Sequence, residues 1–175
     1  MFHAFDNPGP DRATTRPEWM ALLARAPLPL LEQALAPLQP QHRTEWLRRP
    51  ETGLYMVQGR AGGTGERFNL GEVTVTRCAL RWHTQDTTAA DSATAVGVGY
   101  VLGRLHRHAE LAAQADALLQ QGSHRDTLEQ TLLQPVRQHL ARQMAEQQAR
   151  VQSTRVDFFT VAREAGGADN EEDGA

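Results

Sequence analysis

The chain has 175 residues, with 18 arginines and lysines against 21 aspartates and glutamates, for a formal net charge of −3. A chain of this length buries one respectable core, and its charge provides no basic field for nucleic acid. The chain contains no lysine, so all of its lysine-or-arginine residues are arginines. Because the forked donors of arginine suit phosphate and carboxylate groups, a phosphate-related role stays open.

The cysteine content and the two ends limit the class of protein further. Cys78 is the single cysteine, so an internal disulfide is excluded and the chain cannot by itself ligate an iron–sulfur cluster or a structural zinc. The start lacks a secretion signal, and the most apolar stretch, residues 19–38, is interrupted by charges and prolines. We therefore expect a cytoplasmic protein without a membrane span.

Composition also predicts the domain boundaries. Residues 1–14 are punctuated by proline and glycine, and residues 166–175 are small and acidic. Such segments cannot bury enough apolar surface to order themselves. The prediction is a flexible N-terminus over 1–14, a single α+β domain with a C-terminal helical arm over 15–165, and a disordered acidic tail over 166–175.

The domain begins with two predicted helices. Thr15 and Glu18, in the sequence TRPE, have the spacing of a capping box, and apolar residues follow at helical intervals. A short second helix is expected from Leu30 to Leu35, between prolines.

Four strands are predicted next. Residues 43–49 and 53–60 are joined by PETG, which predicts a hairpin with Gly53 at positive φ. Residues 72–82 alternate but change phase between Arg77 and Cys78, which predicts a β-bulge. Residues 96–103 place Val96, Val98, Tyr100 and Leu102 on one face and mainly glycine on the other, so close approach of another backbone or a partner is expected. The fold class is α+β, a four-stranded antiparallel sheet flanked by N-terminal helices and long C-terminal helices.

The C-terminal part is predicted to be helical, with an unusual final helix. One helix runs from Leu105 to Gln121 with Gly122 as its C-cap, and another begins near Asp126 and continues through Pro135. Its later part offers only a narrow apolar stripe, too narrow to anchor a long helix in its own core. The apolar residues that follow are Val156, Phe158, Phe159 and Val161. Either they fold back onto the sheet, or the polar helix is an arm that presents them to another chain.

The glycine-rich stretch GRAGGTGERFNLGE, residues 59–72, is the first candidate for chemistry. A Walker A loop requires lysine, which the chain lacks, and a dinucleotide fingerprint must open a helix, whereas this stretch connects two strands. A turn with Gly62, Gly63 and Gly65 free to take positive φ is favoured. The alternative is an anion nest of backbone amides supported by Arg60 and Arg67.

His108 is the second candidate. The triplet HAE imitates half of a zinc deaminase motif, but the cysteine pair that should follow is absent. A helical register places His108 at the border of an apolar face, which favours a hydrogen-bonded structural histidine. An anion contact shared with Arg104 is the competing interpretation. Motifs for a serine or cysteine nucleophile are not recognisable, so catalytic residues stay unknown and no cofactor or metal site is assigned.

Three blocks of the sequence resemble the PhnG family, the small subunit of the bacterial carbon–phosphorus lyase core complex. They are residues 49–81, which contain ETGL and GGTGERF, residues 99–120, which contain GRLHRHAE, and residues 155–164, which contain RVDFFT. They occur in the family's order and cover most of residues 19–163.

This resemblance implies a cytosolic subunit in an assembly with the H, I and J subunits, closest to the I subunit, served by an ATP-binding-cassette subunit. The assembly acts in phosphonate catabolism and displaces adenine from ATP with methylphosphonate, giving alpha-D-ribose 1-methylphosphonate 5-triphosphate. The iron–sulfur cluster and its S-adenosylmethionine chemistry belong to the J subunit. We therefore expect an accessory subunit whose interface includes Val156, Phe158, Phe159 and Val161. The alternative is a small stand-alone enzyme or phosphate-binding module that uses Arg60, Glu66, Arg67 and His108.

Overall fold

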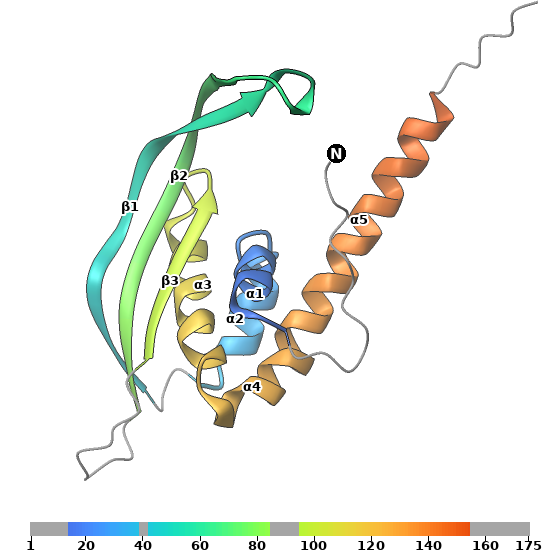
Figure 1. The fold of residues 1–175 in the computed structure, drawn as a ribbon. Helices are drawn as coiled ribbons and strands as arrows, with labels where there is room; N and C mark the ends of the chain where they lie inside the picture. Colours follow the sequence, from blue (N-terminus) through green and yellow to red (C-terminus); the bar gives the residue numbers. More distant parts are fainter. Residues whose placement is uncertain (1–13, 39–41, 85–94, 155–175) are drawn as a thin grey trace, which may run out of the picture.

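Helices cover one face of a three-stranded antiparallel sheet in the computed structural model, which describes residues 14–38, 42–84 and 95–154 (Figure 1). The strands lie in the order β1–β2–β3. The elements in chain order are α1 (Arg16–Leu23), α2 (Leu28–Leu35), β1 (His42–Arg60), the 3₁₀ turn η2 (Ala61–Gly63), β2 (Arg67–Thr84), β3 (Ala95–Leu102), α3 (His106–Leu119), α4 (Gly122–Leu128), the π-helical turn η3 (Glu129–Leu133) and α5 (Gln134–Ser153). The predicted α+β class is confirmed.

The prediction of four strands is wrong, because the two expected to form the first hairpin are one continuous strand. β1 passes through the PETG sequence without turning, and Gly53 does not have a positive φ. Register shifts between Trp46 and Arg48 and between Arg48 and Glu51 place extra residues on β1 relative to β2. Proline is tolerated at bulges and on edge strands, and Pro50 occupies both settings. The residues of PETG, which predicted a turn, therefore belong to an irregular but continuous strand whose bulges accommodate the proline.

The predicted bulge between Arg77 and Cys78 lies on the neighbouring strand instead. β2 keeps an unbroken register with β3 through these residues, and the irregularity falls opposite them on β1. The inward side chains of β2 follow one phase, because Thr76, Cys78, Leu80 and Trp82 are all buried. Val73 and Val75, which made the strand seem to alternate in the other phase, have their side chains on the opposite face of the sheet.

The glycines of β3 allow helix α3 to approach the sheet closely. A Cβ atom added to Gly97 would lie 1.8 Å from the carbonyl oxygen of Ala113, and one added to Gly99 would lie 2.2 Å from that of Ala109. Neither position can accept a side chain without separating the strand from the helix. The predicted close approach of another backbone is confirmed, and that backbone is α3.

The helical layer is organised around α3, whose residues are buried almost without interruption between the sheet and the other helices. α1 begins with the predicted capping box, in which the backbone N–H of Thr15 donates to the Glu18 carboxylate at 2.7 Å. α2 begins two residues earlier than predicted, with Pro29 in its first turn. α3 ends on Gln120, and Gly122 opens α4 instead of capping α3.

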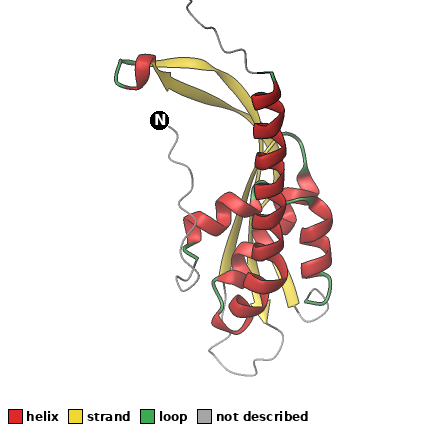
Figure 2. Cartoon of the chain, turned by 90° about the vertical axis from the view of Figure 1, so that its right-hand side faces the viewer, coloured by secondary structure: helices red, strands yellow, loops and turns green. Residues whose placement is uncertain are grey.

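Two elements project beyond this core (Figures 1 and 2). Past the end of β3, the hairpin of residues 54–74 continues with β1 and β2 paired only to each other. α5 leaves the core after Leu140, which is partly buried against it, and residues 141–153 are all exposed. The sequence predicted that the narrow apolar stripe of this helix could not anchor it in the core of its own chain. This is confirmed for the second half of α5.

Candidate functional site

The glycine-rich stretch forms the tip of the projecting hairpin. Gly62 has φ of 59° and Gly63 has φ of 82°, values that favour glycine, and the backbone N–H of Gly65 donates to the carbonyl of Ala61 at 2.9 Å. The guanidinium of Arg60 donates to the carbonyl of Gly65 at 3.1 Å. The predicted glycine-permitted turn is confirmed at Gly62 and Gly63, but Gly65 does not have a positive φ. Binding of an anion there stays a prediction.

The candidate residues at the tip are exposed and lie apart from the fourth candidate. Arg60 and Arg67 form the last cross-strand pair of the hairpin, beside exposed Glu66. His108 lies in α3, buried in the core. The structure therefore brings the three tip residues together and leaves His108 out of their site.

His108 has the contacts of a structural histidine. Its Nε2 lies 2.8 Å from the carbonyl oxygen of Leu23, and because a carbonyl only accepts, Nε2 carries the proton and donates. This hydrogen bond joins α3 to the end of α1. Arg104, the other member of the competing anion site, is exposed.

Two of the sequence blocks meet in a chain of hydrogen bonds that sequence reasoning missed. The hydroxyl of Thr76 donates to the carbonyl of Gly103 at 2.7 Å, and lies 3.0 Å from the Thr52 hydroxyl. Because each hydroxyl has one proton, Thr52 donates to Thr76 and accepts from Nε2 of His106 at 2.8 Å. Thr52 comes from ETGL, and Gly103 and His106 come from GRLHRHAE. The shared presence of these blocks was the only available signal, since they are 50 residues apart in the chain.

An ion-pair cluster adjoins this chain of hydrogen bonds. Glu51 accepts from Arg77 and from Arg48, each at 2.8 Å. These two guanidinium groups, Arg77 first, lower the pKa of the Glu51 carboxyl. One carboxylate thus lies between two arginines on the outer face of the sheet, the face opposite to α3.

A groove of about 1060 Å³ runs from this cluster across the sheet to α1. Its lining is mainly apolar and comes from all three strands. The residues that line it are Ala21, Ala24, Arg25, Glu51, Thr52, Gly53, Leu54, Tyr55, Val75, Arg77, Tyr100, Val101 and Leu102. Such a surface is suited to an apolar ligand or a protein segment rather than to a small polar substrate.

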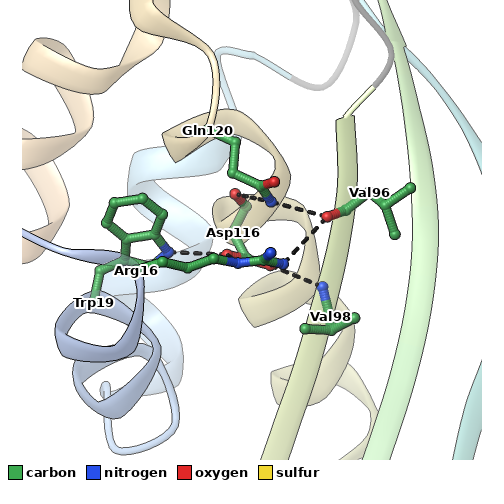
Figure 3. A network of polar contacts seen from close by, with 6 residues as sticks. All are labelled: Arg16, Trp19, Val96, Val98, Asp116 and Gln120. Atoms are coloured by element: carbon green, nitrogen blue, oxygen red, sulfur yellow. Dashed lines mark hydrogen bonds and ion pairs between the residues drawn. The ribbon is translucent and has the colours of Figure 1, made fainter.

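Asp116 of α3 is the other polar centre that the sequence did not reveal (Figure 3). It is fully buried and accepts from Arg16 at 2.8 and 3.1 Å, from the indole N–H of Trp19 at 2.9 Å and from the backbone N–H of Val98 at 3.0 Å. Its hydrogen bond with Arg16 raises the pKa of that guanidinium. The carboxylate therefore ties α1 and the free edge of β3 to α3, which is a structural role.

The cysteine is not a reactive nucleophile. The Cys78 thiol is buried and donates to the carbonyl of Ala109 at 3.1 Å. Burial, and after it the charge of Glu110, raises the pKa of this thiol to about 11. Near neutral pH the reactive thiolate is therefore scarce.

The remaining predictions concern the aromatic end, a metal site and a membrane span, and the structure describes only part of the residues involved. Val156, Phe158, Phe159 and Val161 lie outside the described residues, so their interface role stays a prediction. Over residues 14–38, 42–84 and 95–154, no three His, Cys, Asp or Glu side chains gather as metal ligands. The helices in these ranges are all too short or too polar to cross a bilayer.

Comparison with known proteins agrees with the resemblance seen in the sequence. The family model described as "Phosphonate metabolism protein PhnG" matches residues 14–164. A relative from Rhizobium meliloti (strain 1021), named "Alpha-D-ribose 1-methylphosphonate 5-triphosphate synthase subunit PhnG", is 40% identical over 148 residues, which cover 85% of this chain and 88% of the relative. The chain belongs to the PhnG family of phosphonate metabolism proteins.

Proposed function

We propose that this chain is a noncatalytic docking subunit of alpha-D-ribose 1-methylphosphonate 5-triphosphate synthase. In this role it supports displacement of adenine from ATP by methylphosphonate within the carbon–phosphorus lyase core complex. The proposal is supported by the name of the relative and by the family match. It is also supported by the contacts of the described site residues: His108 is buried and apart from the hairpin tip, and the Thr52 hydroxyl accepts from His106 instead of giving its proton to that imidazole.

The observation that carries the docking role is the projecting hairpin. Leu54, Tyr55, Phe68 and Leu70 are all largely exposed on a two-stranded element that has no core of its own. A monomeric protein rarely leaves such a surface to solvent, whereas a subunit covers it with another subunit. α5 repeats the pattern with exposed Met144 and Val151.

Membership of a multi-subunit synthase implies partner subunits. We assign the H, I and J subunits as partners, with the I subunit closest, and an ATP-binding-cassette subunit for activity. ATP, and the iron–sulfur cluster with S-adenosylmethionine, are cofactors of the complex and not of this chain. The complex is cytoplasmic in this proposal.

The aromatic end is the proposed anchor. In the sequence, Phe158 and Phe159 come five and six residues after Ser153, the last residue of α5. The exposed part of α5 extends away from the core of its own chain (Figure 1). Aromatic side chains are enriched at interface centres, where a few residues carry a large share of the binding energy and are weakened by truncation to alanine.

Coexpression with the I subunit tests this proposal. The full chain should copurify with the I subunit, and the double substitution Phe158→Ala and Phe159→Ala should lower the affinity at least 100-fold while the circular dichroism spectrum is unchanged. The matched control replaces both residues with Tyr, which retains the aromatic rings and should retain the complex. A full chain that is a stable monomer and ignores the I subunit would contradict the proposal.

The alternative function, a stand-alone enzyme or phosphate-binding module, is tested by titration calorimetry. Its four residues do not share one site, because His108 is in the core while Arg60, Glu66 and Arg67 are at the hairpin tip. A docking subunit should release no heat with ATP or methylphosphonate. Saturable binding that Arg60→Ala and Arg67→Ala abolish would favour the alternative.

A further inference from the structure

Helices α4 and α5 are joined by the π-helical turn η3, where the regular hydrogen bonds of an α-helix are interrupted. The backbone N–H of Gln134 donates to the carbonyl of Glu129, which is five residues earlier in the chain instead of four. Pro135, in the first turn of α5, has no N–H to donate. Helices change direction at π-turns and prolines of this kind. The backbone alone therefore does not fix the direction of α5 firmly.

Apolar contacts keep this joint in the core. The side chains of Leu132, Leu133 and Val136 are fully buried, and α5 packs against η3 and α1. Beyond Leu140, residues 141–153 are exposed and extend for about 20 Å at the rise of an α-helix. Because apolar contacts are not directional, they hold the root of α5 without setting its angle. A small tilt at η3 is therefore enlarged at the far end of the helix.

Three polar side chains connect the two sides of the joint. Arg137 of α5 forms an ion pair with Glu129, the first residue of η3. Thr14 contacts both of them, because its hydroxyl donates to the Glu129 carboxylate at 3.0 Å and accepts from the Arg137 guanidinium at 2.5 Å. Hydrogen bonds to charged groups are short and depend on direction, so they set an angle where apolar contacts do not. We call Thr14, Glu129 and Arg137 the joint cluster.

Thr14 is itself fixed by the rest of the helical layer. It is 4% exposed, and its carbonyl accepts from the guanidinium of Arg125 in α4 at 2.6 Å. The same guanidinium lies 5.3 Å from the centre of the Trp19 ring in α1. α1 begins at Arg16, two residues after Thr14. The position of Thr14 thus depends on α1 and α4, and its hydroxyl transmits that position to α5.

We propose that the Thr14 hydroxyl is a latch that sets the direction of α5, and that its displacement from the joint cluster frees α5 to tilt about η3. The helix stays attached when the latch opens, because the Glu129–Arg137 ion pair and the buried side chains of the joint do not require the hydroxyl. Thr14 lies where the first 13 residues of the chain enter the folded domain, so any event that displaces this point opens the latch. The inference goes beyond the docking function and does not depend on it, since every contact is within one chain.

Distances between spin labels measure the direction of α5 in the full chain without a partner. One label is placed at Gln148→Cys in the exposed part of α5, and the other at Leu102→Cys at the end of β3. The native Cys78 stays unlabelled, because it is buried. Thr14→Val keeps the branched shape of threonine but removes the hydroxyl. We expect this substitution to make the 102–148 distance distribution, measured by double electron–electron resonance, at least twofold broader.

Two controls separate the latch from a general loosening of the fold. A second pair of labels, at Leu102→Cys and Ser123→Cys, reports on the core, and its distance distribution should be unchanged by Thr14→Val. Thr131→Val is the matched variant, because the Thr131 hydroxyl belongs to the same joint but donates to the carbonyl of Thr127 at 2.8 Å and not to α5. It should leave both distributions as they are.

Each other outcome overturns the inference. An unchanged 102–148 distribution in folded Thr14→Val would show that the hydroxyl does not set the direction of α5. Equal broadening of the 102–123 distribution would mean that the core has loosened, and equal broadening by Thr131→Val would assign the direction to η3 itself.

A second variant reaches the joint cluster from α5 and decides the question even if Thr14→Val does not fold. Arg137→Lys keeps the positive charge but loses the forked donor that contacts both Glu129 and Thr14. We expect it to broaden the 102–148 distribution at least twofold as well, and an unchanged distribution would overturn the latch. Thr14→Ser, which retains the hydroxyl, should restore the narrow distribution of the wild type.

Discussion

Asp116 shows how one buried side chain can organise several elements. Its carboxylate accepts from two side chains of α1 and from the edge of β3, and Gln120 on the next turn of α3 donates to the carbonyl of Val96 at 2.8 Å. The edge strand is therefore closed by side chains over this region, which protects it from pairing with other strands.

Replacing this carboxylate should be costly. Asp116→Ala leaves the indole N–H of Trp19 and the N–H of Val98 without their acceptor, so we expect a loss of about 3–5 kcal/mol in the free energy of unfolding. Urea denaturation measures this loss. Asp116→Asn keeps one acceptor oxygen and should lose less. An Ala variant within about 1 kcal/mol of the wild type would contradict the assigned role.

Cys78 links stability to alkaline pH. The pKa of its thiol is about 11 in the folded chain, above the usual 9.0, so the folded state holds this proton more tightly than the unfolded state does. The stabilisation is complete below pH 9 and is lost as the pH rises towards 11. Urea unfolding at pH 8 and pH 10.5 should show a loss in the wild type that exceeds the loss in Cys78→Ala by about 1–2 kcal/mol. Equal losses would contradict the shift.

At the scale of elements, the sequence predicts those features that depend on neighbouring residues. The capping box at Thr15 and the glycine turn at Gly62 and Gly63 were both predicted correctly, because a local spacing sets them. The strand count failed at Pro50, where the local turn signal was outweighed by pairing along the whole length of β2. Long-range pairing of this kind is invisible in a window of four residues.

The phase of α5 should determine where the aromatic end is presented. Insertion of one alanine between Gln147 and Gln148, in the exposed part of the helix, turns everything beyond it by about 100° and moves it by about 1.5 Å. Thermal unfolding should be unchanged, because these residues do not contact the core. Affinity for the I subunit should fall at least tenfold, whereas Gln148→Ala should have no effect. Undiminished affinity would show that the arm does not position the aromatic end.

At the scale of the whole molecule, the candidate site divides into parts that the sequence could and could not predict. The separation of His108 from Arg60, Glu66 and Arg67 follows from the length of the hairpin, which only the continuous β1 reveals. The meeting of Thr52 with His106 likewise depends on the register of three strands. Residue type could identify these candidates, but topology decided which of them are neighbours.

In the projecting hairpin, the residues needed for folding differ from those needed for assembly with other subunits. Beyond β3 its strands support only each other, so residues such as Glu66 and Arg67 can change with almost no effect on the melting temperature of the isolated chain. A screen of purified variants for thermal stability would score them as neutral. We expect their identity to be constrained instead by assembly with partner subunits, so that the same variants lose activity of the assembled synthase. Laboratory evolution of this subunit should therefore produce separate patterns of substitution in the core, where folding limits change, and in the hairpin, where assembly limits it.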